Sequence, residues 1–177
     1  MATLTIEDVK AKIRAVPNFP KEGIVFRDIT TGLKDAQTMK EMVDYLCAQY
    51  SDCKIDYIAG IESRGFIFGM PMAYKLNCGF IPIRKPNKLP AETIKESYDL
   101  EYGSDTIEIH ADAIEEGANV LVVDDLLATG GTAKAACNLV KKAGGNLVGA
   151  AFLIELKDLN GREKLGNCGK VISMLQY

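Results

Sequence analysis

Short, largely apolar segments alternate with segments of helical periodicity along most of the chain. The clearest apolar segment runs from Asn119 to Asp124, and the segments from Ile55 to Ile61 and from Leu147 to Leu156 are similar. Strands that are apolar on both faces are typical of a parallel sheet that helices cover on both sides. The alternation therefore predicts an α/β fold in which a parallel, twisted sheet has helices on both faces.

The other elements of this scheme follow from periodicity and from helix breakers. A capping box at Thr5 starts a helix that should end at or before Pro17. Further helices are expected over residues 36–50, 66–76 and 132–143, and further strands over 80–83 and 171–175.

Two segments do not fit the alternation of strands and helices. Residues 16–31 contain two prolines and a glycine and are expected to be irregular. Residues 86–110 are polar, and within them 98–102 and 106–110 flank a Gly-Ser turn, as in an antiparallel hairpin. A long polar excursion of this kind is often a mobile lid over an active site.

Length and charge limit the classes of protein that need to be considered. The 177 residues fit a single domain, and 47% hydrophobic with 25% charged residues is ordinary for a soluble globular protein. A net charge of -3 provides no general attraction for nucleic acid or an anionic membrane. The longest apolar run, residues 147–154, is too short to span a bilayer. We therefore expect a cytoplasmic protein that binds neither nucleic acid nor membrane.

The five cysteines do not form a metal-binding or disulfide pattern. None of them belongs to a C-x-x-C pair, and His110 is the single histidine of the chain. A zinc site and a disulfide framework are both disfavoured. We expect free thiols and no metal ion bound by protein side chains alone.

The strongest local motif runs from Val122 to Thr132, with the sequence VVDDLLATGGT. A buried strand ends in two carboxylates, a turn of small and hydroxyl residues follows, and a helix begins. Backbone N–H groups at such a helix start form a phosphate cradle, and ligands of parallel sheets bind at this edge. Ionised carboxylates only accept hydrogen bonds, so Asp124 and Asp125 suit the hydroxyl groups of a sugar. A ribose 5-phosphate would satisfy both parts of the motif.

Residues Asp124 to Thr132 resemble the phosphoribosyl-pyrophosphate signature of the type I phosphoribosyltransferases. The competing phosphate-binding motifs G-x-x-x-x-G-K-[ST] and G-x-G-x-x-G are not found in a strand–turn–helix context. The resemblance implies the fold of that family, with a small N-terminal base-binding hood over residues 1–33 and a flexible catalytic loop over residues 86–110. It assigns the ribose 5-phosphate to Asp124, Asp125, Ala128, Thr129, Gly130, Gly131 and Thr132.

The similarity extends over most of the chain and is greatest to the adenine phosphoribosyltransferases. Residues 19–30 (FPKEGIVFRDIT) resemble the base-binding stretch of that group, residues 60–69 its pyrophosphate loop, and residues 97–103 its catalytic loop. The resemblance assigns adenine to Val25, Phe26, Arg27 and Leu126. It assigns pyrophosphate to Glu62, Ser63, Arg64, Gly65, Arg84, Lys85, Lys88 and Tyr102.

One position separates this sequence from the related enzymes that use 6-oxopurines. Those enzymes carry an acid where this chain has Ala128, so another residue must handle the proton of the base. The resemblance gives that role to Glu101, with Arg64 as the second catalytic residue. The basic residues around Arg64 and Lys85 provide the positive charge that a pyrophosphate leaving group requires.

The expected reaction transfers the phosphoribosyl group of phosphoribosyl pyrophosphate to adenine and yields AMP and pyrophosphate, a step of purine salvage. The resemblance implies Mg²⁺, bound mainly through phosphoribosyl pyrophosphate, and a homodimer. Two alternatives stay open at this point. The acceptor base would be xanthine or orotate in the first, and the chain would be a nucleic-acid-binding regulator that senses phosphoribosyl pyrophosphate in the second, although it has no basic arm.

Overall fold

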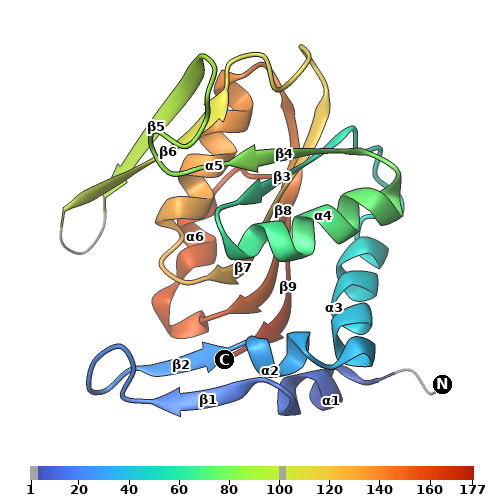
Figure 1. Cartoon of the computed structure of the whole chain (residues 1–177), viewed down its shortest axis with the longest axis vertical. Coiled ribbons are helices and arrows are strands. Elements are labelled where there is room, and N and C mark those ends of the chain that lie inside the picture. The colour runs from blue at the N-terminus through green and yellow to red at the C-terminus, as the bar shows by residue number, and fades with distance from the viewer. Residues whose placement is uncertain (1–3, 100–102) are drawn as a thin grey trace. The chain divides into compact units, whose positions relative to one another are not determined.

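Five parallel strands form the central sheet of the chain in the computed structural model, which describes residues 4–99 and 103–177 (Figure 1). Their order across the sheet is β4-β3-β7-β8-β9. The strands are β3 (Tyr57–Ile61), β4 (Gly79–Ile83), β7 (Asn119–Leu127), β8 (Asn146–Glu155) and β9 (Lys170–Gln176). The parallel sheet expected from the apolar segments is therefore confirmed.

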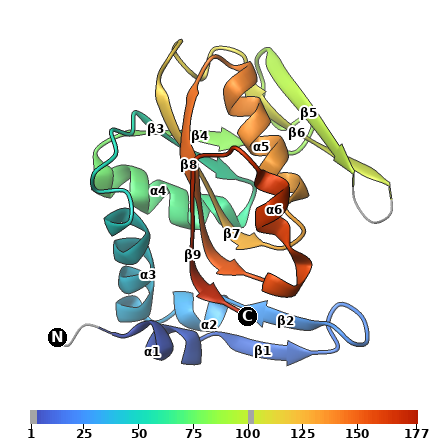
Figure 2. The ribbon, with the colours of Figure 1, turned by 180° about the vertical axis from the view of Figure 1, so that it is seen from behind.

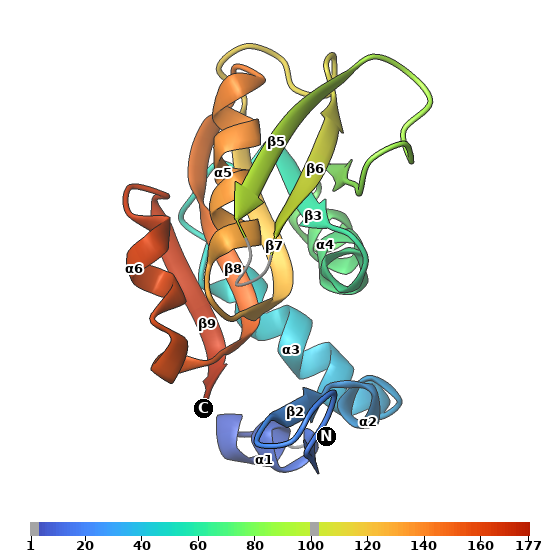
Figure 3. The same cartoon turned by 90° about the vertical axis from the view of Figure 1, so that its left-hand side faces the viewer.

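Helices α4 (Arg64–Leu76) and α5 (Gly131–Lys142) cover opposite faces of this sheet (Figure 3). Alternate residues of β3 show the two faces. The side chain of Ile58 faces Gly69 of α4, whereas Ala59 belongs to the core cluster that includes Leu139 of α5. Both faces are consequently buried, which explains why the strands are apolar throughout.

A two-stranded antiparallel ribbon, β5 (Thr93–Asp99) and β6 (Ser104–His110), packs against α5. An isolated bridge between Arg84 and Glu108 joins it to the chain that follows β4. The expected hairpin is confirmed, but its first strand begins five residues earlier than the sequence suggested, at Thr93. The partners of the added residues on β6 include the buried Ile107 and Ile109, which hold this part of the polar segment to the core.

Residues before the sheet form a unit of their own, which ends at Tyr45. It contains three helices and a small antiparallel sheet, and its last helix continues across that boundary. The elements are α1 (Ile6–Ala11), β1 (Arg14–Pro17), β2 (Val25–Asp28), α2 (Thr30–Leu33) and α3 (Ala36–Ala48).

One expectation for this unit was wrong. Helix α1 has the expected capping box at Thr5 and ends before Pro17, at Ala11. Residues 16–31 were expected to be irregular, but residues 14–17 pair with residues 25–28 as antiparallel strands, and an Arg14–Asp28 ion pair joins their ends. Pro17 is compatible with this pairing because a two-stranded sheet consists only of edges, where a missing N–H is tolerated.

The C-terminal part of the chain contains two elements that the sequence did not suggest. A single 3-10 turn, η1 (Lys157–Leu159), and the short helix α6 (Gly161–Leu165) connect β8 to β9. Figure 2 shows α6 next to α5. Among the described residues, no helix is both long and apolar enough to cross a membrane. The five cysteines all carry free thiols.

The buried Tyr50, in the turn after α3, provides a test of contacts within the larger unit, residues 46–177. Its hydroxyl donates to the carbonyl oxygens of Ala150 in β8 and Lys170 in β9, at 3.0 and 2.8 Å. We expect Tyr50→Phe to lower the free energy of unfolding by about 1–3 kcal/mol, because both carbonyls lose this buried donor. Tyr74→Phe is the control, since that side chain is 89% exposed. Equal denaturation midpoints for the two variants would contradict this account.

Candidate functional site

The candidate site lies where the connections of two neighbouring strands diverge. Strand β3 leads into α4 on one face of the sheet, and the adjacent β7 leads into α5 on the other. When the five strands are numbered in chain order, they lie across the sheet as 2-1-3-4-5, which is a doubly wound order. Its switch point lies between the first and third strands, β3 and β7. The carboxyl ends of β3 and β7 therefore form the crevice in which such sheets bind ligands.

The signature segment lines a cavity of about 200 Å³ at this switch point. Its residues form the end of β7, the following turn and the first turn of α5, where the leading N–H groups have no partner within the helix. The cavity also includes Arg64, so the structure brings together two of the predicted groups of site residues. The lining residues are Arg64, Asp124, Leu126, Leu127, Ala128, Thr129, Gly130, Gly131, Thr132 and Ala133.

Close backbone packing fixes the shape of this turn. Gly130 has a φ of +80°, which favours glycine, and a Cβ atom on it would lie 2.3 Å from the carbonyl oxygen of Gly161. A Cβ atom on Gly161 would in turn lie 2.1 Å from the carbonyl oxygen of Ala128. Sequence reasoning missed Gly161, because nothing near it in the chain indicates that α6 lies against the signature turn.

The two carboxylates differ in their surroundings. Asp125 is nearly buried and its Oδ2 atom accepts a 2.5 Å hydrogen bond from Nε of Arg64. Asp124 accepts a 2.8 Å hydrogen bond from the backbone N–H of Asp125. Burial of the Asp124 carboxyl, followed by repulsion from the Asp125 carboxylate, raises the pKa of Asp124 well above its usual value. Both residues lie inside β7 and not at its end, since the strand continues to Leu127.

The turn after β3 approaches the same strand from the other side. A Cβ atom on Gly65 would lie 2.6 Å from the carbonyl oxygen of Val123 and 3.2 Å from Oδ1 of Asp124, so only glycine fits here. Ser63 precedes the first residue of α4, and the Glu62–Ser63 peptide bond is cis. Arg64, the first residue of α4, lies beside Asp125.

The predicted basic residues lie at the end of β4 and contact acidic partners. Nε of Arg84 and the backbone N–H of Lys85 each donate a 2.9 Å hydrogen bond to Oε2 of Glu62. The Arg84 bond, followed by the Lys85 N–H, lowers the pKa of Glu62. The ammonium group of Lys85 forms an ion pair with Asp105 of β6. Lys88 is exposed, and its charge contributes to the lowered pKa of Glu62.

The remaining predicted residues lie elsewhere in the chain. Val25, Phe26 and Arg27 form most of β2 in the N-terminal unit, where the Phe26 ring meets the Phe19 ring edge-on at 5.3 Å. Glu101 and Tyr102 lie outside the described residues.

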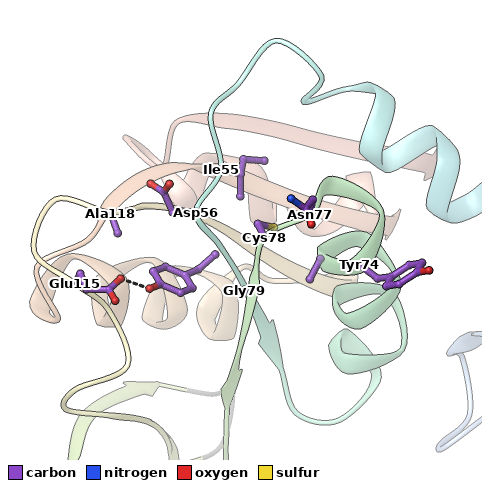
Figure 4. A pocket seen from close by; sticks show the side chains of 10 residues that line it. Ile55, Asp56, Tyr74, Asn77, Cys78, Gly79, Glu115 and Ala118 are labelled. Atoms are coloured by element: carbon purple, nitrogen blue, oxygen red, sulfur yellow. Dashed lines mark hydrogen bonds between the residues drawn. The ribbon is translucent and has the colours of Figure 1, made fainter.

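A larger hollow of about 720 Å³ lies at the opposite, amino ends of β3, β4 and β7 (Figure 4). Glu115 lies at one side of it and accepts a hydrogen bond from the Tyr57 hydroxyl, and Asp56 adds a second carboxylate. Two carboxylates and no arginine or lysine make this hollow unfavourable for phosphate. Its lining residues are Ile55, Asp56, Tyr57, Ala73, Tyr74, Asn77, Cys78, Gly79, Glu115 and Ala118.

The fold and the phosphate turn together define the class of protein. A model of the phosphoribosyl transferase domain matches residues 30–172. The adenine phosphoribosyltransferase of Trichodesmium erythraeum is 58% identical over 170 residues, which is 96% of this chain and 99% of that protein.

Solved structures agree with this match. The adenine phosphoribosyltransferase of Thermoanaerobacter pseudethanolicus has a TM-score of 0.94 and 50% identity over 98% of this chain and all of that one. The Saccharomyces cerevisiae enzyme, complexed with an imino-altritol bisphosphate and adenine, has a TM-score of 0.90 and 42% identity over 96% of this chain and 98% of that one. The chain belongs to the adenine phosphoribosyltransferase family.

The raised pKa of Asp124 predicts a conflict between stability and ligand binding. The pKa of Asp124 is higher in the folded chain than in the unfolded chain, so protonation of Asp124 stabilises the fold. This stabilisation is complete below the unfolded pKa of about 3.9 and is lost as the pH rises through the folded pKa. Asp124→Asn removes this titration. We expect the variant to melt at a higher temperature than wild type at pH 7 and at nearly the same temperature near pH 4.

Asp125→Asn is the matched variant, because it removes the charge that neutralises Arg64 and should not stabilise the protein. A lower melting temperature for Asp124→Asn at pH 7 would contradict the prediction.

Proposed function

We propose that this chain transfers the 5-phosphoribosyl group from phosphoribosyl pyrophosphate to adenine and releases AMP and pyrophosphate, as in purine salvage. The observation that carries this function is the pair Asp124–Asp125 at the cavity of about 200 Å³ at the switch point of the sheet. The names of the relatives support the same reaction, and adenine is a ligand in the yeast structure.

Ribose 5-phosphate would occupy the cavity formed by the signature turn. The backbone N–H groups at the start of α5, with the hydroxyls of Thr129 and Thr132, would bind the phosphate. The carboxylates of Asp124 and Asp125 would accept hydrogen bonds from the two ring hydroxyls. Ala128, Gly130 and Gly131 would contribute backbone to the turn without side chains that fill it.

Pyrophosphate would bind between the turn at residues 62–65 and the end of β4. Arg64, Arg84, Lys85 and Lys88 would offset the charge that develops on the leaving group. Three of these cations contact carboxylates among the described residues, and the pairs are Arg64–Asp125, Arg84–Glu62 and Lys85–Asp105. Binding would exchange the carboxylates of Asp125 and Asp105 for phosphate oxygens, while Glu62 keeps Arg84 and the Lys85 backbone in position. Ser63, Gly65 and Tyr102 complete the proposed pyrophosphate set.

Adenine would be recognised by residues 25–27, with the Phe26 ring stacked on the base and backbone groups of Val25 and Arg27 on its edge. Leu126 would contribute an apolar contact from the cavity at the switch point. Glu101 would handle the adenine proton, because Ala128 removes the acid that the 6-oxopurine enzymes have in the signature turn.

Mg²⁺ enters this proposal together with phosphoribosyl pyrophosphate. The carboxylate oxygens of Asp124 and Asp125 suit a hard cation that also binds phosphate oxygens. Among the described residues no group of three or more His, Cys, Asp or Glu side chains is placed to hold a metal by itself. When bound, the cation would neutralise part of the pyrophosphate charge. The proposal also includes a homodimer, which rests on the family resemblance, and a cytoplasmic location, which rests on the composition of the sequence.

The base specificity is the most direct test of the proposed reaction. With phosphoribosyl pyrophosphate and Mg²⁺, we expect AMP from adenine, and a catalytic efficiency at least about 10²-fold lower with hypoxanthine, guanine or xanthine. A site built to hydrogen-bond one purine edge leaves buried groups unpaired with the wrong base. Comparable efficiency with hypoxanthine would overturn the choice of base and leave the sugar-phosphate site intact.

Glu101→Gln tests the proposed acid/base residue. The amide keeps the size of the side chain but does not titrate, so the turnover number should fall by about 10²-fold or more with little change in KM. Glu163→Gln, a change of the same kind at an exposed residue of α6 outside the proposed site, is the control. Turnover of Glu101→Gln near that of wild type, under conditions where chemistry limits the rate, would remove Glu101 from the mechanism.

A further inference from the structure

A further ion pair, between the buried Glu155 and the more exposed Arg162, lies outside the groups discussed so far and next to the contact of Gly161 with the signature turn. We propose that Glu155 and Arg162 are positioning residues for sugar-phosphate binding, because they hold Gly161 against the turn that receives the 5-phosphate. This inference rests on the proposed function, since it concerns the same phosphate cradle. It assigns a role in that site to the connection between β8 and β9.

Arg162 is held by four hydrogen bonds to two strands of the sheet. Its Nε and Nη2 atoms donate to the Glu155 carboxylate at 3.0 and 2.5 Å. Nη1 donates to the carbonyl oxygen of Val171 at 2.8 Å, and Nη2 also donates to the Ser173 hydroxyl at 3.3 Å. A planar guanidinium with this set of partners has one orientation. The residue next to it, Gly161, is thereby fixed in position.

Gly161 contacts the signature turn through backbone atoms, so the position of Gly161 limits where the turn can lie. There is no room for a methyl group between Gly161 and the Ala128 carbonyl, or between Gly130 and the Gly161 carbonyl. A shift of Gly161 towards the turn would force Ala128 and Gly130 to move, and a shift away would leave the turn unsupported. The geometry of the N–H groups that follow Gly130 depends on this contact.

Glu155 is also connected to the signature turn through the sheet. It pairs with Leu127, the last residue of β7 before the turn, and the N–H of Leu156, the residue after β8, donates to the Leu127 carbonyl at 2.9 Å. Its side chain is only 7% exposed, so its bonds to Arg162 are largely shielded from water.

Glu163 offers a matched control. It lies on the same short helix as Arg162, but its side chain is exposed and it has the same carboxylate chemistry as Glu155. Glu155→Gln and Glu163→Gln therefore make the same chemical change, one within the ion pair and one beside it. Gly161→Ala provides an independent variant that keeps every charge and obstructs only the backbone contact.

The experiment measures the KM values for phosphoribosyl pyrophosphate and for adenine, the melting temperature, and the dissociation constant of ribose 5-phosphate by calorimetry. We expect Glu155→Gln and Gly161→Ala to raise the KM for phosphoribosyl pyrophosphate and the dissociation constant of ribose 5-phosphate by about 10-fold or more, the scale of a lost charged contact. The KM for adenine should stay within about twofold, and Glu163→Gln should match wild type. Arg162→Lys should also raise both constants, because one ammonium group cannot make all four hydrogen bonds of the guanidinium.

The outcomes separate this inference from the proposed function. A purely structural pair would lower the melting temperature and the fraction of active protein, with wild-type constants for the sugar phosphates in the folded variants. That result would overturn the inference alone. If Glu155→Gln does not fold, the KM for phosphoribosyl pyrophosphate and the dissociation constant of ribose 5-phosphate in Gly161→Ala and Arg162→Lys test the inference instead. Wild-type protein that neither binds ribose 5-phosphate nor forms AMP would instead refute the proposed function, and the inference with it.

Discussion

Two neighbouring carboxylates with little access to water impose the main electrostatic constraint on this structure. Strand β7 places Asp124 and Asp125 side by side, where burial and mutual repulsion raise the pKa of Asp124. Their position follows from the pairing of β7 with β8, which continues past the carboxylates to Leu127. The cost of this arrangement is tolerated because Arg64 lies against Asp125.

Other pairs of a carboxylate with a basic side chain surround the site. Glu62 holds Arg84, Asp105 pairs with Lys85, and Glu155 pairs with Arg162. These pairs belong to different elements, so each joins two parts of the larger unit at the edge where the ligand is proposed to bind. The Lys85–Asp105 pair would have to open for Lys85 to bind ligand, whereas the Glu62–Arg84 and Glu155–Arg162 pairs would stay closed.

The sequence was sufficient to predict the sheet and the signature turn, because both are encoded locally. Uniformly apolar strands and the order of small and hydroxyl residues from Ala128 to Thr132 need no knowledge of distant contacts. The β1–β2 ribbon was missed because Ile13 and Val16 follow helical spacing from Val9, and four-residue strands give a weak periodic signal. The role of Gly161 was not predictable for another reason: its contacts with Ala128 and Gly130 lie over 30 residues away in the chain.

The proposed reaction depends most on where the sugar phosphate binds, and a crystal structure of the complex with AMP tests this most directly. We predict that the phosphate accepts hydrogen bonds from backbone N–H groups of residues 129–132 and that the ribose hydroxyls donate to Asp124 and Asp125. A phosphate bound instead at Arg84 and Lys85, with the signature turn free of ligand, would contradict the account.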